Sequence, residues 1–325
     1  MKFSILFLLF FFVTIMSVNA QSSESPENPY QAEEMSRKLK QKEESNRRFE
    51  ALKSVGEYSR NVKNRTRTGA IQVINNIYRK PTKDESKTLT ADKEDLKKYA
   101  QFMRQSDAGL TKLIIDRGCA DYTSVLNVSA DCLKYTMPGA GSSFSFRTGN
   151  YRVRRLSDLT YREDGFYSAG VLAHGIIVNI GDIPLEQVTT QTNGLKFLID
   201  FETASEYKKA EEIDGQIDDG IESNGFFYCR SAKTDDDATY ILRSIAYRGS
   251  YYRAMQGFVY DELDFDERRD VLVAFRIVRR DNEGVTILWK TLENQKSPAI
   301  KKPSREELKR EEDKFTAETG SKDKN

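Results

Sequence analysis

Residues 271–289 read VLVAFRIVRRDNEGVTILW, and this stretch decides the fold class of the chain. Its two arms flank the short polar turn 281–284, which is typical of a β-hairpin. Every second residue of each arm is large and apolar: Val271, Val273, Phe275 and Ile277, then Val285, Ile287 and Trp289. A period of two buries one face of each strand. The stretch therefore predicts two antiparallel strands that cover a core.

The same period extends upstream to about residue 142. Phe144 and Phe146 alternate with polar residues before a Gly149-Asn150 turn. Residues 171–180 are apolar at nearly every position, which predicts a central strand covered on both faces. The alternation from Leu195 to Phe201 predicts a further, half-buried strand. Because the connections between these segments are short, we expect a mostly antiparallel sheet over residues 142–292.

Helical patterns precede the strands. Leu96, Tyr99 and Met103 have amphipathic spacing within the segment 90–118. Asp107 is a good N-cap for a second helix that carries Leu110, Leu113 and Ile114 and ends at Gly118. Residues 33–80 form a charged arm with a thin apolar stripe at helical spacing. The predicted class is therefore α+β, with a helical arm and short helices before the sheet, and a core over residues 90–292.

The two ends of the chain have different compositions. Residues 1–20 combine Lys2, an apolar run too short for a comfortable membrane span, and the small residues of a cleavage site after Ala20. This is typical of a secretory signal peptide, so we expect a periplasmic or extracellular protein with no stable membrane span after cleavage. Residues 21–32 and 293–325 have too little apolar surface to fold and are expected to be disordered.

Charge is balanced overall but unevenly distributed. The chain has 51 basic and 50 acidic side chains, which argues against a nucleic-acid partner. Residues 33–80 carry a net charge of about +7 and residues 200–270 of about −9. The two regions could steer partners or attract each other. The alternative is that they are simply two solvated faces of unequal composition.

Three cysteines are expected to meet an oxidising compartment. A bridge between Cys119 and Cys132 would close a short loop and stabilise the fold by on the order of 3 kcal/mol. Cys229 ends an apolar run and is then expected to be a buried free thiol. A bridge between Cys132 and Cys229 is the alternative, because spacing alone does not define pairing.

Motifs for catalysis or metal binding are weak. His174 is the only histidine, which excludes a multi-histidine metal site. Its neighbours at alternate positions are apolar, so a core histidine is a better interpretation than a catalytic base. The acidic run 214–225 lacks the glycine and glutamate that a calcium-binding EF-hand loop requires. We therefore expect no metal and no cofactor.

The strongest candidate for a contact surface is the trio Tyr251, Tyr252 and Arg253. Tyrosine and arginine are enriched in binding surfaces. The alternative is ordinary packing of an edge strand and its loop. The sequence favours an exported, non-enzymatic interaction protein that binds a protein or an envelope polymer. The second hypothesis is a secreted hydrolase whose carboxylates converge only in the fold.

Overall fold

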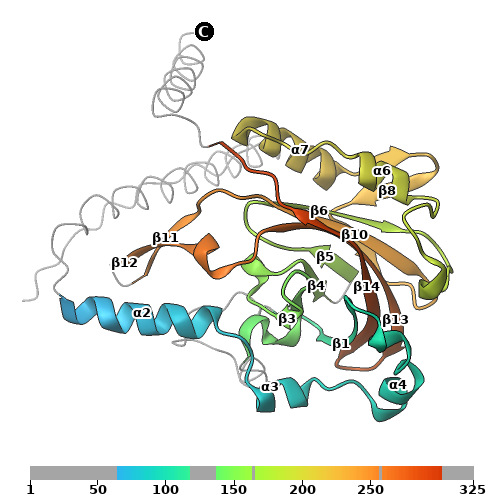
Figure 1. Cartoon of the computed structure of the whole chain (residues 1–325), viewed down its shortest axis with the longest axis horizontal. Helices are drawn as coiled ribbons and strands as arrows, with labels where there is room; N and C mark the ends of the chain where they lie inside the picture. Colours follow the sequence, from blue (N-terminus) through green and yellow to red (C-terminus); the bar gives the residue numbers. More distant parts are fainter. Residues whose placement is uncertain (1–63, 118–136, 163–164, 256–257, 302–325) are drawn as a thin grey trace, which may run out of the picture. The chain divides into compact units, whose positions relative to one another are not determined.

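The computed structural model describes residues 64–117, 137–162, 165–255 and 258–301, all of which belong to one compact unit, Asn61–Asn325. Within the described residues, three helices precede the strands. They are α2 (Asn64–Tyr78), α3 (Lys83–Thr88) and α4 (Lys93–Lys98). Strands dominate from residue 108 onward (Figure 1). The predicted α+β class is confirmed.

A seven-stranded sheet forms the centre of the described part of the chain, and all of its strand pairs are antiparallel. In spatial order its strands are β1 (Ala108–Ile114), β14 (Gly284–Lys296), β13 (Arg269–Arg280), β10 (Thr239–Ala246), β6 (Ala173–Asn179), β8 (Phe226–Cys229) and β7 (Ile221–Ser223). β13 and β14 are the predicted hairpin. The Asp281 carboxylate accepts hydrogen bonds from the N–H groups of Glu283 and Gly284 and so closes the turn.

A smaller five-stranded sheet covers one face of the large sheet. Its strands are β3 (Asn150–Tyr151), β2 (Ser143–Ser145), β4 (Leu159–Arg162), β5 (Gly165–Ser168) and β9 (Ser231–Lys233). Aromatic rings fill the space between the two sheets. The ring of Phe166 packs edge-on against Tyr240 and Phe275, with centroids 5.3 and 4.9 Å away. Such pairs contribute about 0.5–1.5 kcal/mol beyond their burial.

Two helices cover the opposite face of the large sheet, α6 (Leu195–Asp200) and α7 (Tyr207–Asp219), as Figure 1 shows. Ile213 and Ile217 of α7 pack in one apolar cluster with Ile176 and Val178 of β6. β6 lies between β10 and β8 in the sheet. Ile177, the residue of β6 between Ile176 and Val178, belongs to the core on the other face. The predicted central strand, covered on both faces, is therefore confirmed.

The predicted strand from Leu195 to Phe201 is wrong, because these residues form helix α6. Leu195 and Leu198, three positions apart, are both fully buried. The Lys196 ammonium donates a hydrogen bond to the Asp200 carboxylate, one helical turn later, at 2.5 Å. Apolar residues at 195, 197, 198, 199 and 201 fit both periods. The helical arrangement is selected by the sheet face that the two leucines cover.

The predicted helix with Leu110, Leu113 and Ile114 is also wrong, because these residues lie in strand β1. β1 pairs along its whole length with β14, whose edge would otherwise be open. Gly109 lies opposite Trp289, and its missing side chain makes room for the indole. The indole N–H donates to the Thr111 hydroxyl at 2.9 Å. This long-range pairing overrides a local spacing that suited a helix.

The described residues include only the beginning of the predicted C-terminal tail and none of residues 1–63. β14 continues to Lys296, and Ser297 and Ile300 beyond it are buried. None of the described helices is long and apolar enough to cross a membrane. Residues 1–63 and 302–325 lie outside the described residues, and with them the predicted signal peptide, the predicted disordered segment 21–32 and most of the segment 293–325. The prediction of disorder is wrong for residues 293–296, which belong to β14.

Candidate functional site

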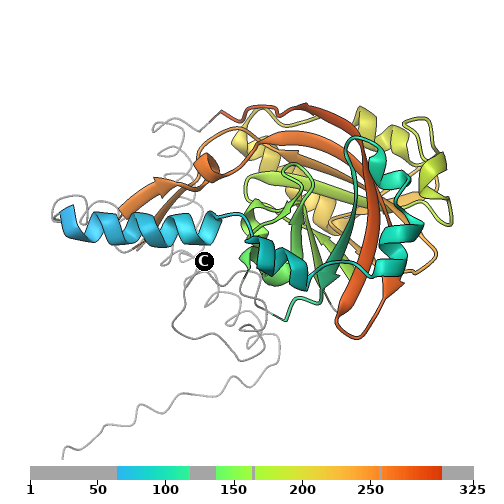
Figure 2. The same ribbon diagram turned by 60° about the horizontal axis from the view of Figure 1, so that its bottom comes forward.

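The predicted contact residues belong to a separate two-stranded sheet beside α2. Tyr252 and Arg253 begin β11 (Tyr252–Met255), which pairs with β12 (Phe258–Asp261), and Tyr251 directly precedes the strand. Figures 1 and 2 show this hairpin and α2 side by side. Tyr252 and Arg253 therefore lie on a short strand, and Tyr251 lies immediately before it.

The strand register separates the trio onto two faces of the hairpin. Tyr252 pairs with Asp261 and Ala254 pairs with Val259. Arg253 pairs with Tyr260 and Met255 pairs with Phe258. Because directly paired residues point to the same side of a sheet, Tyr252 and Arg253 point to opposite sides.

The face that carries Arg253 is an inner face packed against α2. Tyr260, Met255 and Phe258 share an apolar cluster with Ile74 and Tyr78 of the helix. The Tyr78 ring also stacks on Phe265, with centroids 4.7 Å apart. This cluster holds the hairpin and the helix together.

Glu262 is the polar anchor of the inner face. Its side chain has no exposed area, and it accepts a hydrogen bond from the Tyr78 hydroxyl at 2.8 Å. Arg155 and Arg253 pair with the same carboxylate at 3.0 and 3.3 Å. Burial, the Tyr260 hydroxyl and the Glu262 charge all raise the pKa of Tyr78. Arg253 is thus engaged in packing, which is the alternative that the sequence left open.

Tyr251 is also tied to neighbouring residues. Its N–H donates to the Asp261 carboxylate at 2.7 Å, and the Arg155 guanidinium lies 5.0 Å from its ring centroid. Stacking of this kind contributes about 0.5–1 kcal/mol at exposed sites. Tyr251 and Arg253 therefore position the hairpin.

The face that carries Tyr252 is an outer face open to solvent. Tyr252 is 62% exposed and Val259 is 38% exposed. Six large hydrophobic side chains are exposed in the described part of the chain, and four of them gather on this hairpin and α2. They are Ile71, Tyr251, Tyr252 and Val259. Clustered exposed apolar residues mark interaction sites more often than scattered ones do.

A groove of about 590 Å³ runs beside this face. It is lined by α2 through Ile71, Ile74 and Asn75, by Tyr252, by all four residues of β12, and by Asp264 and Phe265. The carboxylates of Asp261 and Asp264 are its charged groups, and no lysine or arginine lines it. The groove is therefore apolar with a negative edge. We call the groove and the outer face of the hairpin the hairpin surface.

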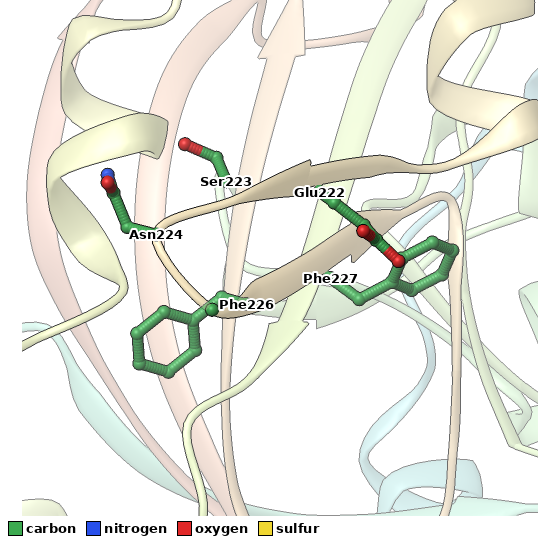
Figure 3. Close-up of a pocket in the computed structure, with 6 residues that line it drawn as sticks. Glu222, Ser223, Asn224, Phe226 and Phe227 are labelled. Carbon is green, nitrogen blue, oxygen red and sulfur yellow. The ribbon is translucent and has the colours of Figure 1, made fainter.

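A second, smaller groove, of about 440 Å³, lies at the β7–β8 turn (Figure 3). It is formed by the consecutive residues 222–227, with Glu222 directly opposite Phe227 across the two strands. The exposed Phe227 ring covers Gly220 so closely that a side chain there would collide with it. Phe227 thus has a packing role, and a single turn offers a smaller contact surface than the hairpin and helix together.

His174 is a core residue, as the sequence favoured. It is 3% exposed on β6. Its Nε2 lies 2.9 Å from the Ala210 carbonyl oxygen of α7, and its Nδ1 lies 2.9 Å from the Tyr247 hydroxyl. A carbonyl only accepts, so Nε2 carries the proton and Nδ1 accepts from Tyr247. Burial lowers the pKa of His174 and favours this neutral form.

Two carboxylates do converge in the fold, but in a closed position. Asp158 and Asp266 have no exposed area and both pair with Arg147, at 2.7 and 2.5 Å. Arg268 pairs with Asp266 as well, at 2.7 Å. In this arrangement both acids neutralise buried arginines and are closed to solvent. The hydrolase hypothesis gains no support from them.

The cysteine prediction is only partly within the described ranges. Cys229 is a free thiol, half-buried instead of buried, with its Sγ 3.8 Å from the Asp218 carbonyl oxygen. Cys119 and Cys132 lie outside the described residues, so their bridge stays a prediction. Among the residues that the structure describes, no cluster of His, Cys, Asp and Glu could hold a metal ion.

Comparison with protein-family models, with curated proteins and with solved structures finds no match to this chain. The function of the chain is therefore inferred from the geometry of the hairpin surface.

Proposed function

We propose that this chain is an exported, non-enzymatic protein that binds a protein or an envelope polymer through the hairpin surface. The observation that carries the proposal is the outer face of β11–β12, where Tyr252 and Val259 are exposed while the inner face is anchored by Glu262. A rigid scaffold that presents an aromatic side chain to solvent reduces the entropy cost of binding.

Export is supported by residues 1–20, whose apolar run and small residues suit signal cleavage. The mature protein should begin at Gln21. N-terminal sequencing of the protein from the periplasm or the culture medium tests this, and a mature protein that retains Met1 would contradict it.

The binding function is tested by substitution on the outer face. Tyr252→Ala and Val259→Ala together should lower the amount of a captured envelope or secreted partner by about tenfold, because aromatic anchors dominate interface energies. The thermal midpoint should change little, since both side chains are exposed.

Tyr207→Ala is the matched control, because Tyr207 is also an exposed tyrosine, 45% accessible, and lies on α7, away from the hairpin surface. This variant should capture the partner as the unmodified protein does. Equal capture by the outer-face variant and the unmodified protein would refute the proposed surface.

A further inference from the structure

The groove follows β12, which is an edge strand within the part of the chain that the structure describes. Glu262 donates its N–H to the Tyr251 carbonyl at 2.8 Å, directly beyond the Tyr252–Asp261 pair, so positions 251 and 262 correspond to a hydrogen-bonded site of the ladder. In an antiparallel ladder such pairs alternate with non-bonded ones. The alternation directs the N–H and C=O groups of Val259 and Asp261 away from β11. Among the described residues, β12 pairs with β11 alone, and these backbone groups have no hydrogen-bond partner.

The size of the groove suits one more strand. All four residues of β12 line it, together with Ile71, Ile74 and Asn75 of α2, so it extends along the whole strand. Four residues of extended chain span about 13 Å, and neighbouring strands lie about 4.8 Å apart. The volume of about 590 Å³ is enough for a short extended segment of a peptide.

Charge indicates the chemistry of the occupant. Asp264 has no ion-pair partner among the described residues, and Asp261 accepts only from the N–H groups of Tyr251 and Leu263. An occupant with lysine or arginine at alternate positions would place these side chains beside Asp261 on the outer face. Its other side chains would then meet Tyr260 and Ile74 on the inner face.

We propose that an extended basic peptide segment of a partner protein binds as a third strand on the free edge of β12, in the groove against α2. This inference rests on the proposed function, because it names the partner of the same surface. Addition of a strand to an open sheet edge derives affinity from backbone hydrogen bonds and specificity from alternate side chains. The edge, the groove and the two carboxylates all point to this one mode.

The first test uses a defined probe. It is a fluorescently labelled pool of peptides of about nine residues, in which Lys alternates with Val, Ile, Leu, Phe or Tyr. Binding is measured by fluorescence anisotropy with the full chain. We expect saturable binding that weakens at least about tenfold when Glu replaces Lys, or when alternate peptide nitrogens are methylated. No binding, or equal binding of the methylated pool, would overturn the proposal.

The second test uses matched substitutions on the two edges of the hairpin. Val259→Pro removes the N–H that faces the groove and leaves the ladder with β11 intact. Ala254→Pro makes the same change on the outer edge of β11. We expect Val259→Pro to weaken peptide binding by at least about tenfold and Ala254→Pro to leave it within about twofold. Equal effects would contradict the assigned edge.

Asp264→Asn gives a test that leaves the backbone unchanged. It should weaken binding of the Lys pool severalfold, most strongly at low salt, because it removes a charge on an exposed side chain. An unchanged affinity at low salt would contradict the role of charge.

Other occupants would give different results. A concentration-dependent dimer in light scattering that Val259→Pro abolishes would show that a second copy takes the edge, which overturns the peptide proposal. A partner whose capture needs Tyr252 but survives Val259→Pro would also overturn it, while leaving the proposed function intact.

Discussion

At the scale of single residues, the environment decides the role of each side chain. Tyr251, Tyr252 and Arg253 look alike as binding residues in the sequence. The register of β11 directs only Tyr252 outward, while Arg253 pairs with the buried Glu262. The sequence could indicate the trio, because tyrosine and arginine cluster there. It could not show which residues of the trio point to solvent, because that depends on α2, which packs on one face of the hairpin. α2 lies more than 170 positions earlier in the sequence.

His174 allows a prediction about pH dependence. Its pKa is lowered by burial, so the unfolded chain binds a proton more readily than the folded one. The stability that the neutral ring contributes is present above the unfolded pKa of about 6.5 and is lost as the pH falls below it. We therefore expect the free energy of unfolding to decrease between about pH 6.5 and 5.5.

Urea denaturation at a series of pH values checks this. His174 is the only histidine, so no other side chain has an ordinary pKa in that window. His174→Gln should be less stable at pH 7, because it loses the contacts to Tyr247 and Ala210. Its stability should be nearly independent of pH across the window. A variant that keeps the pH dependence would contradict this explanation.

At the scale of secondary structure elements, the sequence predicted a strand pair correctly where alternating apolar residues flank a recognisable turn. The β13–β14 hairpin has alternating residues and a turn closed by Asp281, and both signals are local. The predictions for Leu195–Asp200 and for β1 were wrong for the same physical reason. Their apolar spacing fits two periods, and the choice depends on the sheet face or strand edge that each covers.

Helix α2 offers a matched pair of substitutions. Ile74 is 2% exposed and packs on Tyr260, whereas Ile71 is 37% exposed at the groove. Ile74→Ala should reduce the stability of the α2–hairpin contact by about 2–5 kcal/mol, because it leaves a cavity. Ile71→Ala should change it by about 0.5 kcal/mol or less.

Hydrogen exchange of the α2 and β12 amides measures this local stability directly, even where global unfolding is unaffected. Faster exchange in Ile74→Ala alone is the expected result. Equal acceleration in both variants would mean that the exposed isoleucine also holds the helix.

At the scale of the whole described unit, a buried charge network connects the two sheets. Arg147 follows β2 of the small sheet and pairs with Asp158 and Asp266. Asp158 also accepts a hydrogen bond from Ser244 of β10 in the large sheet, at 2.5 Å. No local motif predicts this network, because its acids lie 11 and 119 positions from Arg147. Because Asp158 and Asp266 both pair with a buried arginine, we infer that they stabilise the fold.

Removing Asp158 should therefore destabilise the whole unit. Asp158→Ala leaves the Arg147 guanidinium with one carboxylate fewer and Ser244 without its acceptor, in a place closed to water. Breaking a buried ion pair in this way costs about 3–5 kcal/mol. Asp182→Ala is the matched control, because it removes an aspartate–arginine pair whose acid is 71% exposed. Such surface pairs contribute about 0–1 kcal/mol. Urea denaturation at pH 7 compares the two variants, and similar losses would show that the buried network adds nothing beyond a surface pair.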